Sequence, residues 1–234
     1  MPRKRKPANS SCDTRHEIAV KSRFPDPRYV RGDVVAIGDD LSVETLRDAY
    51  RHGIFPWPHE ELATMPWFSP RRRTVIVFDE LHVGRSLRKS EKRSGFTYSI
   101  DRAFDQVIAS CAGSPRGDEA GTWIGPDIIA AYTRLHRAGD AHSVEVWRDE
   151  ELVGGLYGVD PGGVFTGESM FHRATDASKL ALLFLIEHLR QRGATWIDCQ
   201  VTTPHMAALG AREISRNRFL DMLAEQQSLG LSLF

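Results

Sequence analysis

The chain has 234 residues, of which 41% are hydrophobic and 26% are charged, a composition typical of a globular protein that buries a core. Its 31 basic and 31 acidic residues cancel, so a nucleic-acid partner cannot be argued from net charge, only from local patches. The cysteines Cys12, Cys111 and Cys199 are widely spaced and match no metal-ligand pattern, which argues against a disulfide framework or a zinc site and fits a reducing compartment.

Residues 1–22 show no hydrophobic periodicity, and we expect them to form a basic, flexible tail. Their four consecutive basic residues, Arg3 to Lys6, fit a solvated end better than an RNA contact. No apolar segment follows this run, and no stretch of the chain approaches the roughly 18 apolar residues of a membrane span. The sequence therefore predicts a cytoplasmic protein without a membrane partner.

The first predicted helix lies in S-V-E-T-L-R-D-A-Y-R-H-G. Ser42 can cap it, and Leu46, Ala49 and Tyr50 form an apolar stripe at helical spacing before a glycine ends it. The next stretch, residues 53–70, contains four prolines and several aromatic residues, so we expect no long regular element there.

A basic patch follows between Arg71 and Arg93, where eight Lys or Arg residues stand against three acids. Four of its members recur at helical spacing and would share one face of a helix, namely Arg85, Arg88, Lys89 and Lys92. A solvated helix face and a phosphate-binding face are both consistent with this pattern.

Two further helices are predicted, from Asp101 to about Ala112 and from Pro126 to about Ala138. Asp101 is the expected cap of the first, and Gly139 closes the second. The pattern then changes to three short runs, S-V-E-V-W-R, L-V-G-G-L-Y-G-V and V-F-T-G-E, separated by turn residues. These runs predict a meander of β-hairpins.

A long apolar helix comes next, in D-A-S-K-L-A-L-L-F-L-I-E-H-L-R-Q-R-G, with a cap near Thr175 or Asp176 and an end at Gly193. It leads into the strand W-I-D-C-Q, which completes a β-β-β-α-β order. Because such a helix is a crossover, the V-F-T-G-E and W-I-D-C-Q strands should lie parallel in one sheet.

Polar side chains occupy the carboxyl ends of these two strands, where ligands bind on parallel sheets. Glu168 ends the first, and Asp198 and Gln200 leave the same face of the second because they are two residues apart. Burial of such groups without partners is unfavourable by a few kcal/mol or more, so they are placed either for function or for a structural contact. In the structural alternative, Glu168 caps the following loop and Asp198 ties down a basic side chain.

The chain also resembles a known family over about Gly32 to Leu223. The blocks that carry the resemblance are Y-R-H-G-I-F-P-W, W-F-S-P, L-H-V-G-R-S-L-R, G-T-W-I, E-L-V-G-G-L-Y-G-V, G-E-S-M-F, D-A-S-K, W-I-D-C-Q and H-M-A-A-L-G-A-R-E-I-S-R. Their order and spacing resemble those of leucyl/phenylalanyl-tRNA–protein transferases. Because so many separate blocks agree, the match is specific to this family.

The resemblance implies an α/β fold of the α+β kind, with a C-terminal N-acetyltransferase-like (GNAT) domain that has a mixed sheet and a small N-terminal α/β domain. We expect a tail at 1–22, the small domain at 23–73 and the catalytic domain at 74–234. No metal or organic cofactor is implied, and we expect a monomer.

The implied activity is the transfer of leucine or phenylalanine, and less readily methionine, from aminoacyl-tRNA to the N-terminal Arg or Lys of acceptor proteins. The product carries a degradation signal of the N-end rule pathway. The expected partners are therefore the 3′ end and acceptor stem of an aminoacyl-tRNA and a protein or peptide that begins with Arg or Lys.

Carried onto this sequence, the resemblance assigns three groups of residues. The catalytic residues would be Asp198 and Gln200, with Glu168 as a supporting acid. The substrate-binding residues would be Leu156, Phe165 and Leu185 around the aminoacyl side chain and Trp57 and Trp123 near the terminal adenosine. The tRNA-binding residues would be Arg85, Arg88, Lys89 and Lys92. For the five substrate-binding residues, plain core packing is the alternative.

The chemistry of these residue types suits the implied reaction. An α-amino group titrates near pH 8, so the attacking amine needs little base strength. A carboxamide is no base, but the carbonyl oxygen of Gln200 can orient the amine while Asp198 holds the amide and tolerates developing positive charge. An apolar pocket suits Leu and Phe, and an aromatic face suits a splayed-out base.

Three residues depart from the family's pattern. Phe68 stands where a second Trp is usual, Asp39 stands where Gly is usual, and Leu185 is aliphatic where an aromatic residue can occur. These departures bear on the preference between Leu and Phe more than on the reaction class.

Other functions remain as alternatives at this point. A small-molecule N-acetyltransferase would need a Gly-rich phosphate-binding turn before its crossover helix, and G-E-S-M-F-H-R-A-T-D-A-S-K has one glycine. An aminoacyl-tRNA-dependent ligase of cell-wall peptides is a second enzyme alternative. A catalytically silent tRNA-binding protein is the alternative that is not an enzyme.

Overall fold

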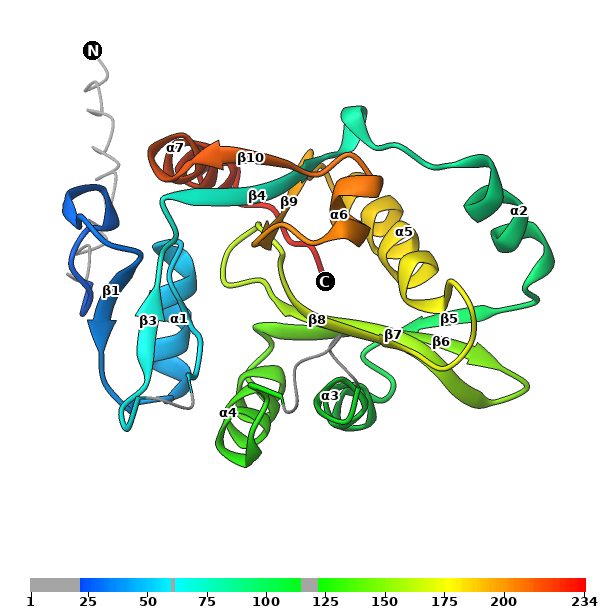
Figure 1. The fold of residues 1–234 in the computed structure, drawn as a ribbon, viewed down its shortest axis with the longest axis horizontal. Helices are drawn as coiled ribbons and strands as arrows, with labels where there is room; N and C mark the ends of the chain where they lie inside the picture. The colour runs from blue at the N-terminus through cyan, green and yellow to red at the C-terminus, as the bar shows by residue number, and fades with distance from the viewer. Residues whose placement is uncertain (1–21, 60–61, 115–121) are drawn as a thin grey trace, which may run out of the picture.

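The computed structural model of the chain describes residues 22–59, 62–114 and 122–234 (Figure 1). Most of the predicted tail, with Arg3 to Lys6 and Cys12, lies outside these residues. Within them, no helix is both long enough and apolar enough to span a membrane.

The N-terminal region forms a small three-stranded sheet with a helix beside it. Its elements in chain order are a 3-10 turn η1 (Pro27–Tyr29), β1 (Val34–Ile37), α1 (Val43–Arg51), β2 (Phe55–Pro56) and β3 (Pro66–Phe68). The strand order is β1-β3-β2, and both pairings are antiparallel. The predicted helix is confirmed, because the Ser42 hydroxyl accepts a hydrogen bond from the Thr45 amide and the apolar stripe is buried.

A second, seven-stranded sheet makes up the rest of the scaffold, in the order β10-β4-β9-β8-β7-β6-β5. Its strands are β4 (Arg72–Val77), β5 (Thr97–Ile100), β6 (Ala141–Arg148), β7 (Glu151–Val159), β8 (Thr166–His172), β9 (Trp196–Gln200) and β10 (Arg212–Ser215). All neighbours are antiparallel except β8 and β9, which are parallel. The predicted β-β-β-α-β order and the mixed sheet are therefore confirmed.

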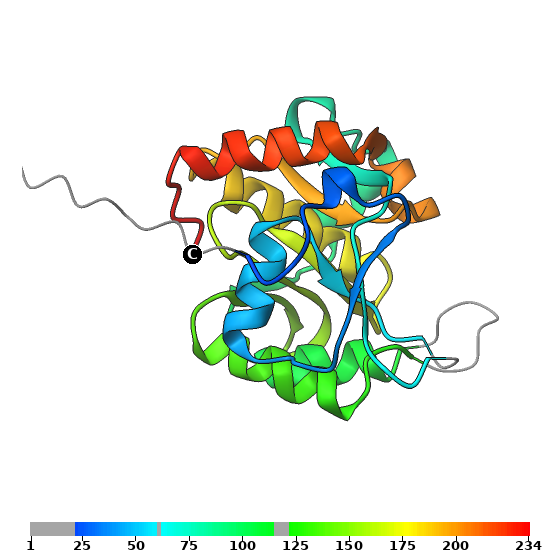
Figure 2. The same ribbon diagram turned by 90° about the vertical axis from the view of Figure 1, so that its left-hand side faces the viewer.

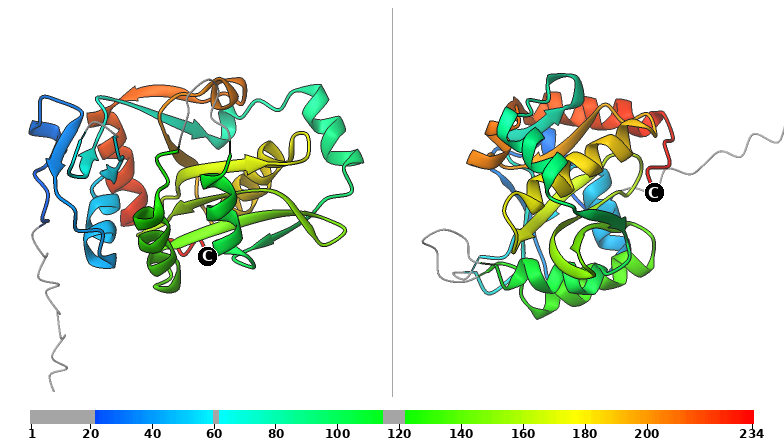
Figure 3. Two further views of the ribbon diagram at one scale, coloured as in Figure 1. Left: turned by 60° about the horizontal axis from the view of Figure 1, so that its bottom comes forward. Right: turned by 90° about the vertical axis from the view of Figure 1, so that its right-hand side faces the viewer.

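Helices cover both faces of this sheet. They are α2 (Arg85–Arg93), α3 (Phe104–Ala112), α4 (Pro126–Arg137), α5 (Ala177–Arg190), α6 (Pro204–Ala208) and α7 (Arg216–Ser228), and a 3-10 turn η2 (Phe78–Glu80) follows β4. The crossover helix α5 packs on β6, β7 and β8, α3 and α4 lie on the opposite face, and α7 lies along β4 and β10 (Figure 1). Helix α2 lies at the end of the molecule away from the small sheet (Figure 3).

The two glycines of L-V-G-G-L in β7 explain how closely these helices approach. A Cβ atom on Gly154 would lie 2.5 Å from the Cβ of Ala177 in α5. A Cβ atom on Gly155 would lie 2.6 Å from the Val144 carbonyl oxygen and 3.4 Å from Val107 of α3. Successive residues of a strand face opposite sides, so each glycine makes room on its own face.

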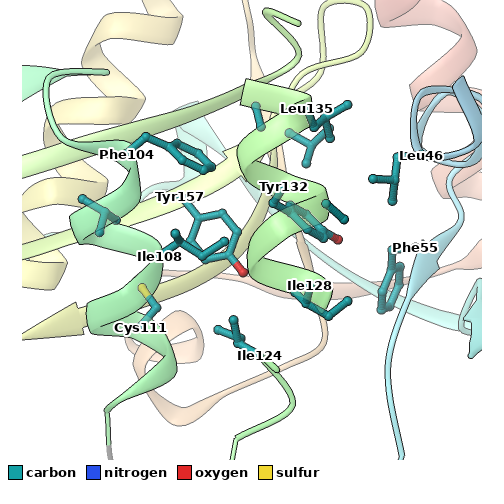
Figure 4. Close-up of a cluster of buried hydrophobic side chains, with 14 of the residues drawn as sticks. Leu46, Phe55, Phe104, Ile108, Cys111, Ile124, Ile128, Tyr132, Leu135 and Tyr157 are labelled. Carbon is teal, nitrogen blue, oxygen red and sulfur yellow. The ribbon is translucent and has the colours of Figure 1, made fainter. Parts of the chain in front are cut away.

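The N-terminal region and the large sheet share one hydrophobic core. Leu46 and Phe55 of the small region face Ile128, Tyr132 and Leu135 of α4, and all belong to one buried cluster (Figure 4). Figure 2 shows the small region in front, with α7 above it and α4 below it. The residues around Tyr50 are therefore held against the large sheet.

The prediction that Asp101 caps the following helix is wrong. Helix α3 begins at Phe104, and the Asp101 carboxylate instead accepts a hydrogen bond from the Ser143 amide at 2.8 Å. The carboxylate of the buried Glu145, on β6, accepts bonds from the amides of Arg102 and Ala103, at 3.4 and 3.3 Å. Both of these amides precede the helix, and the N-cap residue Ala103 makes no side-chain capping bond, so α3 begins without a side-chain cap.

The predicted position of the α5 cap is confirmed, but the predicted capping hydrogen bond is not formed. Asp176 occupies the N-cap position, with a positive φ of 63°, and its side chain makes no capping hydrogen bond. Its carboxylate lies 3.2 Å from the Lys179 ammonium instead.

Candidate active site

The parallel strands β8 and β9 pair at a single point and then separate. Thr166 faces Asp198 in the register, and the Asp198 amide donates to the Phe165 carbonyl at 3.0 Å. Beyond this point a cavity of about 710 Å³ opens. It is lined by all eight residues that the sequence predicted for catalysis and substrate binding, namely Trp57, Trp123, Leu156, Phe165, Glu168, Leu185, Asp198 and Gln200.

Gln200 ends β9 in an unusual backbone conformation, with a φ of 59°. Its amide nitrogen Nε2 donates to Glu168 Oε1 at 2.7 Å. Because only the nitrogen end of a carboxamide can donate to a carboxylate, this bond fixes the orientation of the group. The carbonyl oxygen of Gln200 is thereby turned away from Glu168.

Glu168 is the centre of a hydrogen-bond network that the sequence did not reveal. Tyr50 of α1 donates its hydroxyl to Oε1 at 2.6 Å, and Tyr132 of α4 donates to Oε2 at 3.3 Å. The two tyrosine hydroxyls also contact each other. Tyr50 belongs to a predicted apolar stripe and Tyr132 lies in a predicted helix, but no local pattern connects either tyrosine to Glu168.

Burial raises the pKa of Glu168 to about 7, and the nearby negative charge of Asp198 adds to that effect, while the Tyr50 hydrogen bond opposes it. Burial likewise raises the pKa of Tyr50 and of Tyr132 well above the usual value, so both hydroxyls stay protonated donors.

The expectation that Glu168 lies at a strand end is wrong, because β8 continues to His172. The side chain reaches the cavity because β9 has separated from β8 there.

The Asp198 side chain has no exposed surface, and its carboxylate accepts hydrogen bonds from four donor groups. Arg73 Nε and Nη2 donate to its two oxygens at 2.8 and 2.5 Å, and the Thr166 hydroxyl donates at 3.1 Å. The backbone amide of Gln200 donates to Oδ1 at 2.9 Å. The structural alternative, in which Asp198 ties down a basic side chain, is therefore present in the molecule.

This geometry corrects the role expected of Asp198 toward Gln200. Asp198 holds the backbone of Gln200, whereas Glu168 holds its carboxamide. Arg73 was counted only as part of the basic patch. The signal that could have found it was the need of any buried carboxylate for a partner.

The apolar wall of the cavity comes from three parts of the chain. Leu156 lies on β7, Phe165 directly precedes β8, and Leu185 lies on α5. Each is at most 4% exposed, so these residues belong to the core and also line the cavity. Three further apolar residues that were not predicted from the sequence also line the cavity, namely Met170, Leu182 and Ile197.

The two predicted tryptophans are half-buried and line the cavity. The Trp57 ring packs against Phe55 and, edge-on, against Phe68, with centroid distances of 6.1 and 5.6 Å. Phe68 is the residue that stands where the family usually has Trp, and its ring here supports Trp57. An aromatic residue at this position thus keeps the packing.

Helix α2 lies apart from the cavity. The four predicted tRNA-binding residues, Arg85, Arg88, Lys89 and Lys92, are exposed on it, and none lines the cavity. The basic patch read from the sequence is not continuous, because Arg73 is buried in β4. Leu87 is the buried residue of α2.

In the described part of the chain, no group of three or more histidine, cysteine, aspartate or glutamate side chains is placed to hold a metal ion.

Comparison with known proteins gives consistent matches. The family described as leucyl/phenylalanyl-tRNA protein transferase matches residues 75–224, and the N-terminal domain of the same family matches residues 39–71. A leucyl/phenylalanyl-tRNA–protein transferase of Chromohalobacter salexigens is 55% identical over 85% of this chain and 77% of that protein. One of Pectobacterium carotovorum subsp. carotovorum is 50% identical over 89% of each chain.

Similarity to solved structures is weaker. The crystal structure of FemX matches 78% of this chain and 71% of its own, with a TM-score of 0.45 and 12% sequence identity. The mixed α/β architecture with a mixed sheet is confirmed, and the assignment to the N-acetyltransferase fold stays a prediction.

Proposed function

Since the chain belongs to the leucyl/phenylalanyl-tRNA–protein transferase family, we propose that it transfers leucine or phenylalanine, and methionine less readily, from aminoacyl-tRNA to proteins that begin with Arg or Lys. The product would carry an N-end rule degradation signal. We place this activity in the cytoplasm and in a monomer. The observation that carries the proposal is a carboxamide, fixed in orientation by Glu168, inside a cavity with apolar walls.

The reaction forms one bond and breaks one. The acceptor's α-amine attacks the ester carbonyl carbon of the aminoacyl-tRNA, the new C–N bond forms, and the ester C–O bond to the ribose breaks. The amine loses a proton, and the ribose oxygen leaves as a hydroxyl. The ester is already activated, so correct positioning can supply much of the rate.

Gln200 is the group we assign to that positioning. Its carbonyl oxygen is turned away from Glu168 and can accept an N–H bond from the attacking amine. Glu168 keeps the amide in place, and Asp198 keeps the backbone in place. An ionised Glu168 beside Gln200 also favours the positive charge that appears on the nitrogen.

The donor side of the cavity fits an aminoacyl-adenosine. We assign Leu156, Phe165 and Leu185 to the aminoacyl side chain, because an apolar pocket gains free energy by burying Leu or Phe. We assign Trp57 and Trp123 to stacking on the adenosine, worth roughly 1 to 3 kcal/mol per base.

The exposed basic face of α2, with Arg85, Arg88, Lys89 and Lys92, would contact tRNA phosphates. We further propose residues 23–73 as a small N-terminal domain and 74–234 as a GNAT-like catalytic domain. The separate family matches, to residues 39–71 and 75–224, support this division, and its boundary falls inside β4 of the large sheet.

The defining experiment incubates the protein with leucyl- or phenylalanyl-tRNA and with peptides that begin with Arg, Lys or Ala. Mass spectrometry should find one added Leu or Phe on the Arg and Lys peptides and none on the Ala peptide. Binding of tRNA without any added residue would instead indicate a silent tRNA-binding protein. A parallel reaction with acetyl-coenzyme A tests the N-acetyltransferase alternative.

A further inference from the structure

The buried ion pair between Arg73 and Asp198 adjoins Gln200. The proposed function assigns this ion pair no contact with the substrate. Arg73 of β4 is 1% exposed, and its guanidinium binds both oxygens of the fully buried Asp198 on the neighbouring strand. Replacing a buried ion pair by apolar residues of similar volume is often neutral or stabilising. Stability alone therefore does not explain why this pair is present.

The surroundings of Arg73 fix its guanidinium from several sides. The rings of Phe55 in β2 and Phe219 in α7 lie 4.6 and 4.5 Å from its central carbon. Nη1 donates to the Gly53 carbonyl at 3.3 Å. Three separate parts of the molecule thus hold the planar group, and a Lys ammonium could not reproduce its two-pronged geometry.

The carboxylate passes this constraint on to Gln200. Asp198 Oδ1, which accepts from Arg73 Nε, also accepts from the backbone amide of Gln200. Gln200 has a φ of 59°, in the left-handed region, which is unfavourable for a residue with a side chain and persists only where the surroundings determine it. The Asp198 contact supplies such a determinant.

We propose that Arg73 is a positioning residue of the transfer reaction: through Asp198 it holds the Gln200 backbone in the left-handed conformation from which the carboxamide reaches Glu168. The inference rests on the proposed function and adds Arg73 to it, a residue that acts on Gln200 through its contact with Asp198. In this arrangement, β4 sets the geometry of Gln200, and the N-terminal region contributes through Phe55 of β2 and the Gly53 carbonyl.

The test is a double-mutant cycle of Arg73→Lys and Gln200→Ala, with turnover measured at saturating aminoacyl-tRNA and acceptor peptide. A misplacement on the scale of 1 Å can lower a rate about 100-fold, so Arg73→Lys should lower kcat roughly 10- to 100-fold and leave both KM values within about twofold. In the Gln200→Ala background, Arg73→Lys should change kcat by less than about twofold, because its target is already gone.

Arg216→Lys is the matched control. Arg216 is also buried, but its guanidinium binds the backbone carbonyls of Val30, Gly32 and Ser69 and lines no part of the cavity. This variant should lose stability and keep the wild-type kcat. An equal kcat loss in Arg216→Lys and Arg73→Lys, or an equal loss from Arg73→Lys in both Gln200 backgrounds, overturns the positioning role.

A second measurement needs no activity. The backbone amide of Gln200 should exchange hydrogen faster in folded Arg73→Lys than in the wild type, relative to the Phe78 amide, which directly follows β4 and donates to the Thr195 carbonyl directly before β9. Where Arg73→Lys does not fold, the double variant Arg73→Met/Asp198→Asn removes both charges and serves the same measurement. Unchanged protection of Gln200 in either folded variant contradicts the proposal.

These outcomes separate the two proposals. A wild-type kcat in Arg73→Lys overturns the role of Arg73 alone. A wild-type chain that transfers no amino acid at all overturns the proposed function and, with it, this role.

Discussion

The cavity and helix α2 present charge in opposite ways. In the cavity, Asp198 has no exposed surface, and each of its oxygens accepts hydrogen bonds from fixed donors. On α2, the basic side chains are exposed, and of them Arg88 bonds to the Val83 carbonyl. Buried charges interact strongly and only in one geometry, whereas exposed charges are screened and tolerate motion.

The two regions can therefore make different contributions to a transferase. The cavity can position reacting atoms, because its polar groups are locked by neighbours from α1, α4, β4 and β8. Helix α2 can attract a polyanion without a fixed geometry. Substitutions in the cavity should therefore affect chemistry and stability, and substitutions on α2 should affect binding and its salt dependence.

The largest expected effect is on stability. Asp198→Ala leaves the Arg73 guanidinium buried without a partner, and removal of one member of such a pair typically costs about 3 to 5 kcal/mol. Lys89→Ala on α2 should change the free energy of unfolding by less than about 0.5 kcal/mol. Denaturant unfolding of both variants checks the contrast, and comparable losses would contradict it.

Next in size is the effect of Gln200→Ala on turnover. Loss of the oriented carbonyl oxygen should lower kcat about 100-fold or more, while the affinity for tRNA stays within about twofold. Lys89→Ala should do the reverse, with normal kcat at saturating tRNA. Single-turnover transfer and tRNA titration measure the two quantities, and near-normal turnover in Gln200→Ala would remove its catalytic assignment.

Between the cavity and α2, a pH-dependent effect on stability should come from the cavity. The pKa of Glu168 is about 7 in the folded chain and near 4.5 when unfolded, so the folded state holds the extra proton between these values. Stability contributed by this site is therefore present below pH 4.5 and is lost as pH rises to about 7, by at most about 3 kcal/mol. Glu168→Gln should flatten this part of the unfolding free energy against pH, and parallel curves for variant and wild type would refute the assignment.

The apolar wall should select donors by shape. A pocket formed by Leu156, Phe165 and Leu185 should accept Leu, Phe and Met, and disfavour β-branched Ile and Val by roughly 1 to 3 kcal/mol. A competition among the five aminoacyl-tRNAs for one peptide that begins with Arg measures the ratios, which Lys89→Ala should leave unchanged. Equal transfer of Ile and Leu would show that the pocket is assigned wrongly.

The smallest expected effect is that of single charges on α2. Arg85→Ala or Lys89→Ala should weaken tRNA binding severalfold and reduce the slope of log affinity against log salt by about 0.7 to 0.9 for each phosphate that is no longer neutralised. Arg137→Ala is a matched control, because Arg137 is exposed on α4, far from α2 (Figure 1). A slope unchanged from wild type in all three variants would show that the basic residues of α2 are solvated and do not contact phosphates.

Much of the fold could be predicted because local patterns determine it. The Ser42 cap, the helix that begins at Pro126 and the β-β-β-α-β order each depend on residues within a few positions of one another. The members of the site were named through family resemblance, since Glu168 and Asp198 taken alone fitted a structural role equally well. The sequence could name residues but not their partners.

Local patterns therefore predicted the helices α1, α4 and α5 and the β-β-β-α-β order, and family resemblance named eight residues that line the cavity. Contacts between distant parts of the chain could not be predicted in this way: Arg73 of the basic patch binds Asp198, Tyr50 and Tyr132 both bind Glu168, and Asp101 does not cap α3. The physical reason is separation along the chain. Arg73 and Asp198 are 125 residues apart, and their contact depends on how β4 aligns with β9, which no local spacing encodes.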